Sequence, residues 1–325
     1  MTLSQEIFVL TLYLLPGIGR KTVVRVLNQY SGAPATEVEI LEVIQAYGGS
    51  RGAKITTGDV RSALDRANEI ISASAENNIA TIAITNPAYP DELKNIDDPP
   101  VLLYVKGDLD VLRPKDSVTV IGTRHPTPYA AKSSYQIATR LTEEGQIVIS
   151  GLALGCDTHG HTGCVDAKGL GVAVLAHGLD QIHPKSNTGL AARILEHGGA
   201  LISEYRLGER PQPVYFVERD RIQSGLSSAV LVVETSVDGG TMHTVRFAKK
   251  QGRALGVLAH PANFSDDPKS AGNRELLAEE NVFPISGPGD LGGFLCKLKE
   301  RGSSKPGAPR EKPGKAQQDL FGDER

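Results

Sequence analysis

The chain has 325 residues, room for roughly two domains, and its 35 Lys plus Arg against 38 Asp plus Glu give a formal net charge of −3. Its composition, 40% hydrophobic and 22% charged, excludes a mostly disordered protein. No apolar run reaches the ~18 residues of a membrane span, and the start MTLSQEIFVL lacks the basic region of a signal peptide. With three cysteines and no export signal, the sequence predicts a cytoplasmic protein without a membrane partner. The near-neutral charge means that any phosphate-binding surface must be local, built from a few Arg and Lys.

Residues 1–78 are predicted to form a small all-helical domain. Apolar residues recur at helical spacing from Leu3 to Leu14, and the segment 16–19 then forms a Gly-rich turn. Further helices are predicted through Val23–Leu27, at 36–46 and at 58–75, the last capped by Thr57.

Residues 79–298 are predicted to form an α/β domain with a Rossmann-like, doubly wound, mostly parallel sheet. Short apolar strands are expected at 79–85, 101–105, 118–122, 146–150, 172–176, 229–234, 254–258 and 282–285. Helical patterns lie near 128–144, 158–168, 187–197 and 240–251. Strands that are apolar throughout are buried on both faces, and their alternation with helices predicts right-handed crossovers between parallel strands.

Residues 299–325 are predicted to be a disordered, basic linker that ends in a short peptide motif. The stretch 297–315 holds seven Lys or Arg against two Glu, three prolines and almost no apolar residue.

The usual nucleotide-binding motifs are absent. Gly19-Arg20-Lys21-Thr22 lacks the Gly before the Lys of a Walker A loop and follows no strand. Gly169-Leu170-Gly171 precedes a strand rather than following one, and no Gly-x-Ser-x-Gly elbow occurs. No cofactor is therefore predicted.

The group Cys156, His159, His161 and Cys164 invites a zinc interpretation, which geometry disfavours. On a helix that begins near Asp157, the two histidines point roughly 200° apart. We therefore predict no metal site, and a contact between Asp157 and His161 that fixes the strand-to-helix corner.

Several loops carry residues suited to an anion. Gly122 and Arg124 follow a strand, with Thr127-Pro128 opening the next helix. The other loops contribute Ser150, Gly151, Gly155, Lys185, Asn187, Arg219, Arg221, Ser224, Gly225, Gly239, Gly240 and Thr241. A single Gly-rich loop can simply permit a tight turn, but five such loops at the carboxyl edge of one parallel sheet favour an anion site.

These residues carry a resemblance to the DNA-processing protein A (DprA/Smf) family. It extends in order over about 80–285 and rests on Tyr89-Pro90-x-x-Leu93, Gly122-Thr123-Arg124, Ser150-Gly151-x-Ala153-x-Gly155-x-Asp157-x-x-x-His161, Gly178-Leu179-Asp180, Ser203-Glu204-Tyr205, Phe216-x-x-Arg219-x-Arg221-x-x-x-Gly225-Leu226-Ser227 and Val232-Val233-Glu234.

The resemblance implies a single-stranded-DNA-binding protein, not an enzyme, that protects incoming DNA in natural transformation and loads a RecA-type recombinase. It also implies a homodimer formed through the Rossmann-like domain. Carried onto this chain, the DNA-binding positions are Gly122, Arg124, Ser150, Gly151, Lys185, Asn187, Arg219, Arg221, Gly225, Gly240, Thr241 and Thr244.

Three departures from the family's pattern bear on DNA binding. Leu154 stands where many relatives place a basic residue, and Asp220 replaces the usual Asn between two arginines. We expect this chain to lack the winged-helix domain that often ends the family.

The N-terminal turn resembles a helix-hairpin-helix hairpin, which implies a second DNA contact through Gly17, Gly19, Arg20 and Lys21. In such a hairpin, backbone amides and basic side chains hold a phosphate without reading sequence. An ordinary αα-hairpin, in which Gly only allows the turn, accounts for the same residues.

Two other functions remain open. Gly239-Gly240-Thr241 is distantly similar to the loop of nucleotide phosphoribohydrolases, but no carboxylate follows closely after Thr241. A signalling adaptor that binds a small nucleotide would use the same loops.

The terminal peptide containing Gln317, Asp319, Leu320 and Phe321 resembles the motif by which bacterial DNA proteins hold the sliding clamp. Two adjacent apolar residues in a polar tail suit insertion into a partner's pocket. The alternative is that Leu320 and Phe321 fold back onto the protein's own surface.

Overall fold

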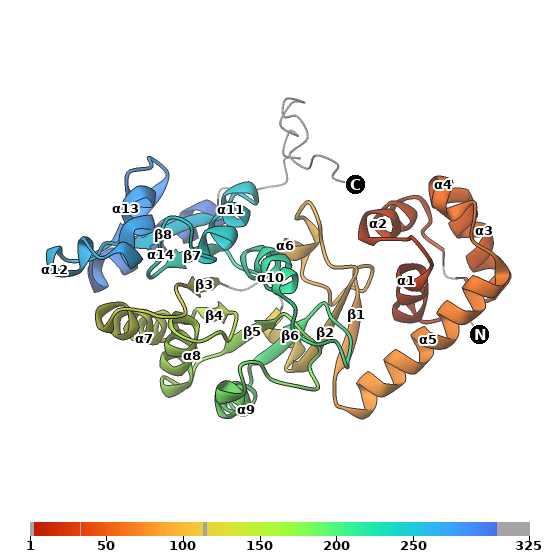
Figure 1. The fold of residues 1–325 in the computed structure, drawn as a ribbon, viewed down its shortest axis with the longest axis horizontal. Coiled ribbons are helices and arrows are strands. Elements are labelled where there is room, and N and C mark those ends of the chain that lie inside the picture. Colours follow the sequence, from red (N-terminus) through yellow and green to blue (C-terminus); the bar gives the residue numbers. More distant parts are fainter. Residues whose placement is uncertain (1–2, 33, 113–115, 304–325) are drawn as a thin grey trace.

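The computed structural model describes residues 3–32, 34–112 and 116–303. Within them, a group of helices at the N-terminal end packs beside a nine-stranded sheet with helices on both faces (Figure 1). The linker predicted to start at residue 299 begins later, because residues 299–303 belong to a helix that ends at Ser303. The rest of the predicted linker and the terminal peptide lie outside the described residues.

The N-terminal helices are α1 (Gln5–Leu14), α2 (Arg20–Gln29), α3 (Glu37–Tyr47), α4 (Gly49–Gly52) and α5 (Thr57–Glu76). Side chains cap several of them, since Ser4 and Thr36 accept hydrogen bonds from backbone amides of the first turns of α1 and α3. The cap of α5 is Thr56, which forms a reciprocal capping box with Asp59, so the predicted cap at Thr57 is wrong by one residue. An apolar core that includes Leu12 and Ile40 holds these helices together and extends to Ala83 and Leu102 of the sheet.

The sheet has the order β1-β2-β6-β5-β4-β3-β7-β8-β9. Its strands are β1 (Ala80–Ala83), β2 (Leu102–Gly107), β3 (Ser117–Ile121), β4 (Ile147–Ser150), β5 (Gly171–Leu175), β6 (Ala200–Ser203), β7 (Ala229–Val232), β8 (Ala254–Leu258) and β9 (Val282–Ile285). Strands β3 to β9 are parallel, whereas β2 pairs antiparallel with both β6 and β1. The predicted doubly wound, mostly parallel sheet is confirmed.

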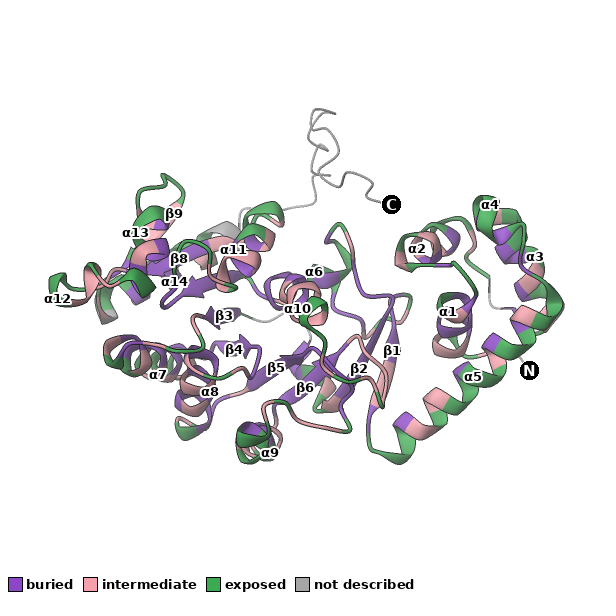
Figure 2. Cartoon of the chain, viewed as in Figure 1, coloured by how far each residue is buried: buried purple, intermediate pink, exposed green. Residues whose placement is uncertain are grey.

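Helices cover both faces of the sheet, so its strands are buried, as Figure 2 shows. Alternate residues of each strand point to opposite faces and therefore enter different cores. On β3, Val118 and Val120 pack against α7 (Pro128–Glu143) and α8 (Cys156–Asp166), together with α14 (Pro288–Ser303). Ile121 faces the other side, toward α11 (Thr241–Lys250) and α13 (Ala271–Leu277). The remaining longer helices are α9 (Thr188–Glu196) and α10 (Pro213–Leu226), and the short ones are α6 (Asp91–Lys94) and α12 (Ala262–Ser265).

Strand β6 and the helices α10, α13 and α14 are among the elements that were not expected from the sequence. Strand β6 is only four residues long. Helix α10 lacks a clear apolar stripe because its buried residues include two arginines, Arg219 and Arg221, on different sides of the helix. Among the described residues, no helix is long and apolar enough to span a bilayer.

Candidate nucleic-acid interface

The chain reverses direction across the sheet between β3 and β7. From β3 it proceeds outward through β4, β5 and β6, and from β7 it proceeds the other way through β8 and β9. At such a switch point the loops after the two central strands diverge and leave a crevice at the carboxyl edge. A cavity of about 550 Å³ lies there, with Gly122 and Arg124 following β3 and Thr235 and Gly240 following β7.

The loop after β3 is held by a buried carboxylate. The Thr127 amide and hydroxyl both donate to the Glu234 carboxylate, at 2.8 and 2.7 Å. The Thr127 hydroxyl in turn accepts from the Ala130 amide and caps α7. Gly122 sits where a Cβ would collide with the Cys156 Sγ, so this position requires glycine for close packing of the two loops. Arg124 is therefore presented from a fixed turn.

Arg124 is exposed, and its guanidinium carbon lies 5.1 Å from the centre of the Phe216 ring. Phe216 belongs to α10 and also lines the cavity. A cation over an aromatic ring is favourably placed, and a planar guanidinium remains able to pair with an anion. Phe216 was part of the sequence motif but was not predicted as a site residue.

The loop after β4 is shaped by Asp157 and Asn187. The Asp157 carboxylate accepts hydrogen bonds from the Gly151 and Ala153 amides, at 3.1 and 3.3 Å. The Asn187 amide donates to the Leu152 carbonyl at 2.8 Å. Because Asn187 is buried and its amide group holds this loop, the structure gives it a positioning contact rather than a place on the cavity wall.

Gly151 leaves room for a buried arginine. A Cβ at this position would collide with the Arg219 guanidinium, which donates to the Val174 carbonyl at 2.8 Å. The Ser150 hydroxyl donates to the Val120 carbonyl at 2.7 Å and so joins β4 to β3. Gly151 and Ser150 therefore build the floor beneath the cavity.

Helix α10 forms one wall of the cavity through Phe216, Arg219 and Asp220. Burial raises the pKa of Asp220 to about 7, and the nearby Asp157 carboxylate adds to this increase, while Arg219, Thr244 and Arg124 oppose it. Burial likewise raises the pKa of Asp157, against the opposing effects of Arg219 and backbone hydrogen bonds. One buried arginine thus lies between two carboxyl groups.

The loop after β7 leads into the N-terminus of α11, where Gly240 is the capping residue and Thr241 the first helical residue. Both line the cavity with Thr244, which is buried. The first amides of a helix lack intrahelical partners and can donate to an anion. Lys185 begins the short turn Lys185–Asn187 and is exposed, but it is not among the cavity-lining residues.

Comparison with known proteins identifies this arrangement. The family model of DNA recombination-mediator protein A matches residues 80–289. The chain belongs to the DNA recombination-mediator protein A family.

Individual members of the family agree with that assignment. The DNA processing protein DprA of Bacillus subtilis is 35% identical over 210 residues, 65% of this chain and 69% of that protein. Protein Smf of Escherichia coli is 37% identical over 195 residues, but the match spans only 51% of its length and 60% of this chain. The resemblance inferred from the sequence is confirmed.

Two solved structures extend the likeness to the fold. DprA from Streptococcus pneumoniae matches with a TM-score of 0.74 and 27% identity over 90% of this chain and 98% of that one. DprA from Helicobacter pylori, whose structure describes a single-stranded DNA binding mode, matches with a TM-score of 0.60 and 29% identity over 68% of this chain and 96% of that one.

Arg221 and Gly225, carried over from the family motif, do not lie at the cavity, which corrects their expected position at the carboxyl edge. Helix α10 runs away from that edge, so its final turn, with Gly225, leads into the start of β7. Gly225 packs against Leu93 and Ile96 near α6. The Arg221 side chain leaves the opposite side of α10 and pairs with Glu204 through two hydrogen bonds of 2.6 and 2.7 Å.

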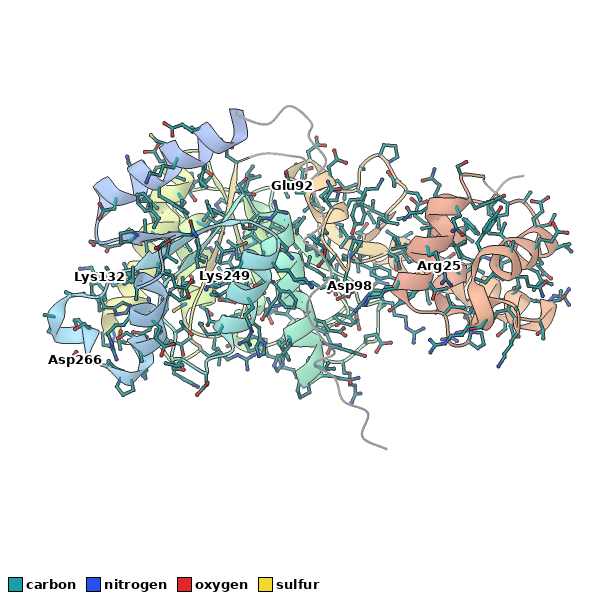
Figure 3. All side chains as sticks on the ribbon, turned by 90° about the horizontal axis from the view of Figure 1, so that it is seen from above. Arg25, Glu92, Asp98, Lys132, Lys249 and Asp266 are labelled. Atoms are coloured by element: carbon teal, nitrogen blue, oxygen red, sulfur yellow. The ribbon has the colours of Figure 1, made fainter. Side chains whose placement is uncertain are left out.

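The N-terminal hairpin also differs from expectation. The Arg20 guanidinium donates to Asp98 and Glu204, each at 3.0 Å, so it faces the sheet rather than an open surface. Figure 3 shows Asp98 where the helical region meets the rest of the molecule. Gly17 adopts a positive φ of 70° in the turn, Gly19 precedes α2, and Lys21 is exposed.

The predicted contact between Asp157 and His161 is wrong. Asp157 turns to the loop amides of residues 151 and 153, whereas neither ring nitrogen of the buried His161 has a hydrogen-bond partner. Burial lowers the pKa of His161 to about 4 and so favours the neutral ring. Within the described residues, no group of His, Cys, Asp and Glu is arranged to hold a metal ion.

Proposed function

We propose that this protein binds single-stranded DNA at the switch-point cavity. The observation that carries the proposal is the combination of Arg124, two loops with Gly turns and the N-terminus of α11 around one crevice. A phosphate fits the amides and the guanidinium, and the Phe216 ring offers a face to a base. A family member from Helicobacter pylori is described as binding single-stranded DNA.

In this proposal the predicted residues divide into two groups. Arg124 and Lys185 contact phosphates, and Gly240 and Thr241 present the backbone at the N-terminus of α11 to the strand. Gly122 lets the loops after β3 and β4 pack closely beside them. Ser150, Gly151, Asn187, Arg219 and Thr244 fix the shape of the cavity through the contacts described above. Arg221 and Gly225 act from outside it, by holding α10 in place.

The test is a salt-dependent binding titration on single-stranded and duplex DNA of equal length. Each phosphate contact on a single strand contributes about 0.7 to the slope of log affinity against log salt. The double variant R124A/K185A should lose most of its affinity and flatten the slope by about twice that amount.

Lys132→Ala is the matched control for the loss of positive charge. Lys132 is exposed on α7, does not line the cavity, and lies toward the end of the molecule opposite Asp98 and the helical region in Figure 3. It should bind like the wild type. Wild-type affinity and slope in R124A/K185A would overturn the assignment of the site, and absence of binding by the wild type would overturn the function.

We further propose that the bound protein acts in the cytoplasm as a homodimer and passes the strand to a RecA-type recombinase. This follows from membership of a recombination-mediator family. Recombinase filament formation on DNA coated with single-strand-binding protein should be faster when this protein is added. Light scattering should give the mass of two chains; an unaffected filament rate or a monomeric mass would contradict the respective part.

We propose that the protein is not an enzyme, against the phosphoribohydrolase alternative. Glu234 lies near the cavity, but both its oxygens accept from Thr127 and it is buried. Incubation with nucleoside monophosphates should release no free base. The nucleotide-adaptor alternative is tested by competition, since a mononucleotide that displaces single-stranded DNA at low concentration would favour it.

The terminal peptide is proposed to bind a bacterial sliding clamp, with the basic linker as a tether that raises local concentration. Residues Gln317, Asp319, Leu320 and Phe321 lie outside the described residues, so the proposal rests on the sequence alone. The 316–325 peptide should bind a clamp in a titration, and L320A/F321A should abolish binding. Equal binding by both peptides would contradict the proposal.

A further inference from the structure

Asp220 is an acidic residue in a cavity proposed to receive a phosphate, and the inference below rests on that proposed function. Its carboxylate lies 3.4 Å from the Arg219 Nε, and its side chain is only 14% exposed. Arg219 does not neutralise Asp220 alone. The Arg219 guanidinium also donates to the Val174 carbonyl and lies near the Asp157 carboxylate.

The charges around Asp220 come from four parts of the fold. On α10 itself Arg219 is adjacent, and α8 contributes Asp157. The loop after β3 contributes Arg124, and α11 contributes the Thr244 hydroxyl together with the His243 ring on the cavity wall. Burial and the neighbouring Arg246 lower the pKa of His243, which favours its neutral ring.

Formal charge then decides what a phosphate requires. With His243 neutral, the cavity-lining residues carry two positive charges, Arg124 and Arg219, and two negative charges, Asp157 and Asp220. One phosphodiester would leave the cavity with a net charge of −1. Two anions in a partly buried site repel each other strongly. The state in which a carboxylate takes up a proton therefore has the lower free energy.

We propose that Asp220 couples binding of a DNA phosphate to the uptake of one proton from solvent, and that its carboxylic acid then donates a hydrogen bond to a phosphate oxygen. Asp157 is less suited to this role, because its carboxylate already accepts from two backbone amides. Those bonds favour the ionised form of Asp157, whereas a bound phosphate adds a further negative charge beside Asp220.

The same residue should act as a pH-dependent regulator of affinity. Burial places the pKa of Asp220 at about 7 in the free protein, and a bound phosphate raises it further. Proton uptake on binding is therefore small below about pH 6.5, where the carboxyl is already protonated, and approaches one proton above about pH 8. By linkage, affinity should fall as the pH rises through this range, with a limiting slope of about tenfold per pH unit.

The experiment measures the affinity of the full chain for oligothymidylate between about pH 6 and 8.5 at constant ionic strength. The wild type should weaken toward high pH, whereas D220N, which keeps the shape and cannot ionise, should be nearly independent of pH. At the upper end D220N should bind at least about tenfold more tightly than the wild type.

Asp238→Asn is the matched control, because it removes the same charge from an exposed position in the loop before α11 that does not line the cavity. It should follow the wild-type curve. Calorimetry in buffers of different ionisation enthalpy counts the protons directly and should give close to one at high pH for the wild type and D238N. Circular dichroism checks that D220N is folded.

The outcomes separate the two proposals. A wild type that binds DNA with no proton uptake, or with the same pH slope as D220N, overturns the role of Asp220 and leaves DNA binding intact. A wild type that binds no DNA at any pH overturns the proposed function and this inference with it. The wild-type proton count decides the matter even if D220N does not fold.

Discussion

Arginines and carboxylates lie on both sides of α10, but their arrangement differs between the two sides. One side faces the switch-point cavity, where Arg124 has no ion-pair partner among the residues that the structure describes. The other side faces the helical region, where Arg20 and Arg221 share the carboxylate of Glu204. A second cavity of about 580 Å³ lies on this side and is lined by Glu204 and by Tyr215 of α10.

The difference teaches that the surrounding carboxylates determine what an arginine can bind. Around Arg20 and Arg221, Asp98 and Glu204 satisfy the guanidinium groups, and Glu218 approaches to 3.6 Å. An incoming phosphate would have to displace these partners. Around Arg124 the nearest described partner is an aromatic ring, which leaves the charge available.

The largest expected effect comes from breaking the ion pairs of Arg20 and Arg221 with Glu204, which we call the junction. Glu204→Ala should lower the free energy of unfolding by about 3–5 kcal/mol, because it leaves two poorly solvated guanidinium groups without their shared partner. Urea denaturation measures this loss, and Glu143→Ala, at an exposed ion pair, should change stability by less than about 1 kcal/mol. Similar losses in the two variants would mean that the junction pairs contribute no more than surface ones.

The variant Gly151→Ala tests the side of α10 that faces the switch-point cavity. The new methyl group would collide with the Arg219 guanidinium and displace it from the Val174 carbonyl. We expect a loss of stability of about 1–3 kcal/mol together with weaker binding of single-stranded DNA. Gly189→Ala is the control, since a Cβ there meets nothing within 4 Å. Unchanged DNA affinity in a folded Gly151→Ala protein would show that the floor of the cavity does not contribute to DNA binding.

Stability against pH gives a more specific signal. A carboxyl whose native pKa is raised from 3.8 to about 7 binds protons more readily in the native state, so rising pH between these values destabilises the protein. D220N should therefore match the wild type near pH 4 and exceed its stability near pH 8 by up to about 4 kcal/mol, because each pKa unit corresponds to about 1.4 kcal/mol. Parallel stability curves would show that Asp220 ionises normally.

The smallest effect is expected at the N-terminal hairpin. Lys21→Ala should change affinity for single-stranded DNA by less than about twofold, because its neighbour Arg20 is paired with Asp98 and Glu204 and does not add a second free cation to the hairpin. A flattening of the salt slope by about 0.7 in a binding titration would instead support a hairpin contact to one phosphate.

The sequence predicted the parts of this molecule that depend on local pattern. The strand before Gly122, the cap at Thr127 and the glycines after β4 each have a signature within a few residues, and parallel strands bring their carboxyl ends to one edge. The family motif added Arg219 and Arg221 as a pair. On a helix, two positions apart means roughly opposite sides, so the two arginines could not share one site.

What could not be predicted depended on contacts between distant segments. Nothing near Arg20 in the sequence indicates Glu204, which lies 184 residues away. Helix α10 was not predicted because its arginines give the segment a polar pattern that is typical of a loop. Burial of these arginines is possible only because carboxylates and carbonyls from other elements surround them.

The position of α10 between two cavities also limits how its segment can vary in length. Tyr215 and Glu218 line the cavity at the helical region, whereas Phe216, Arg219 and Asp220 line the other. Inserting one residue ahead of them would turn the rest of the helix by about 100° and move these side chains out of both cavities. We therefore expect this stretch to tolerate substitutions far better than insertions or deletions, so that a scan of single-residue insertions would find it among the least permissive segments of the chain.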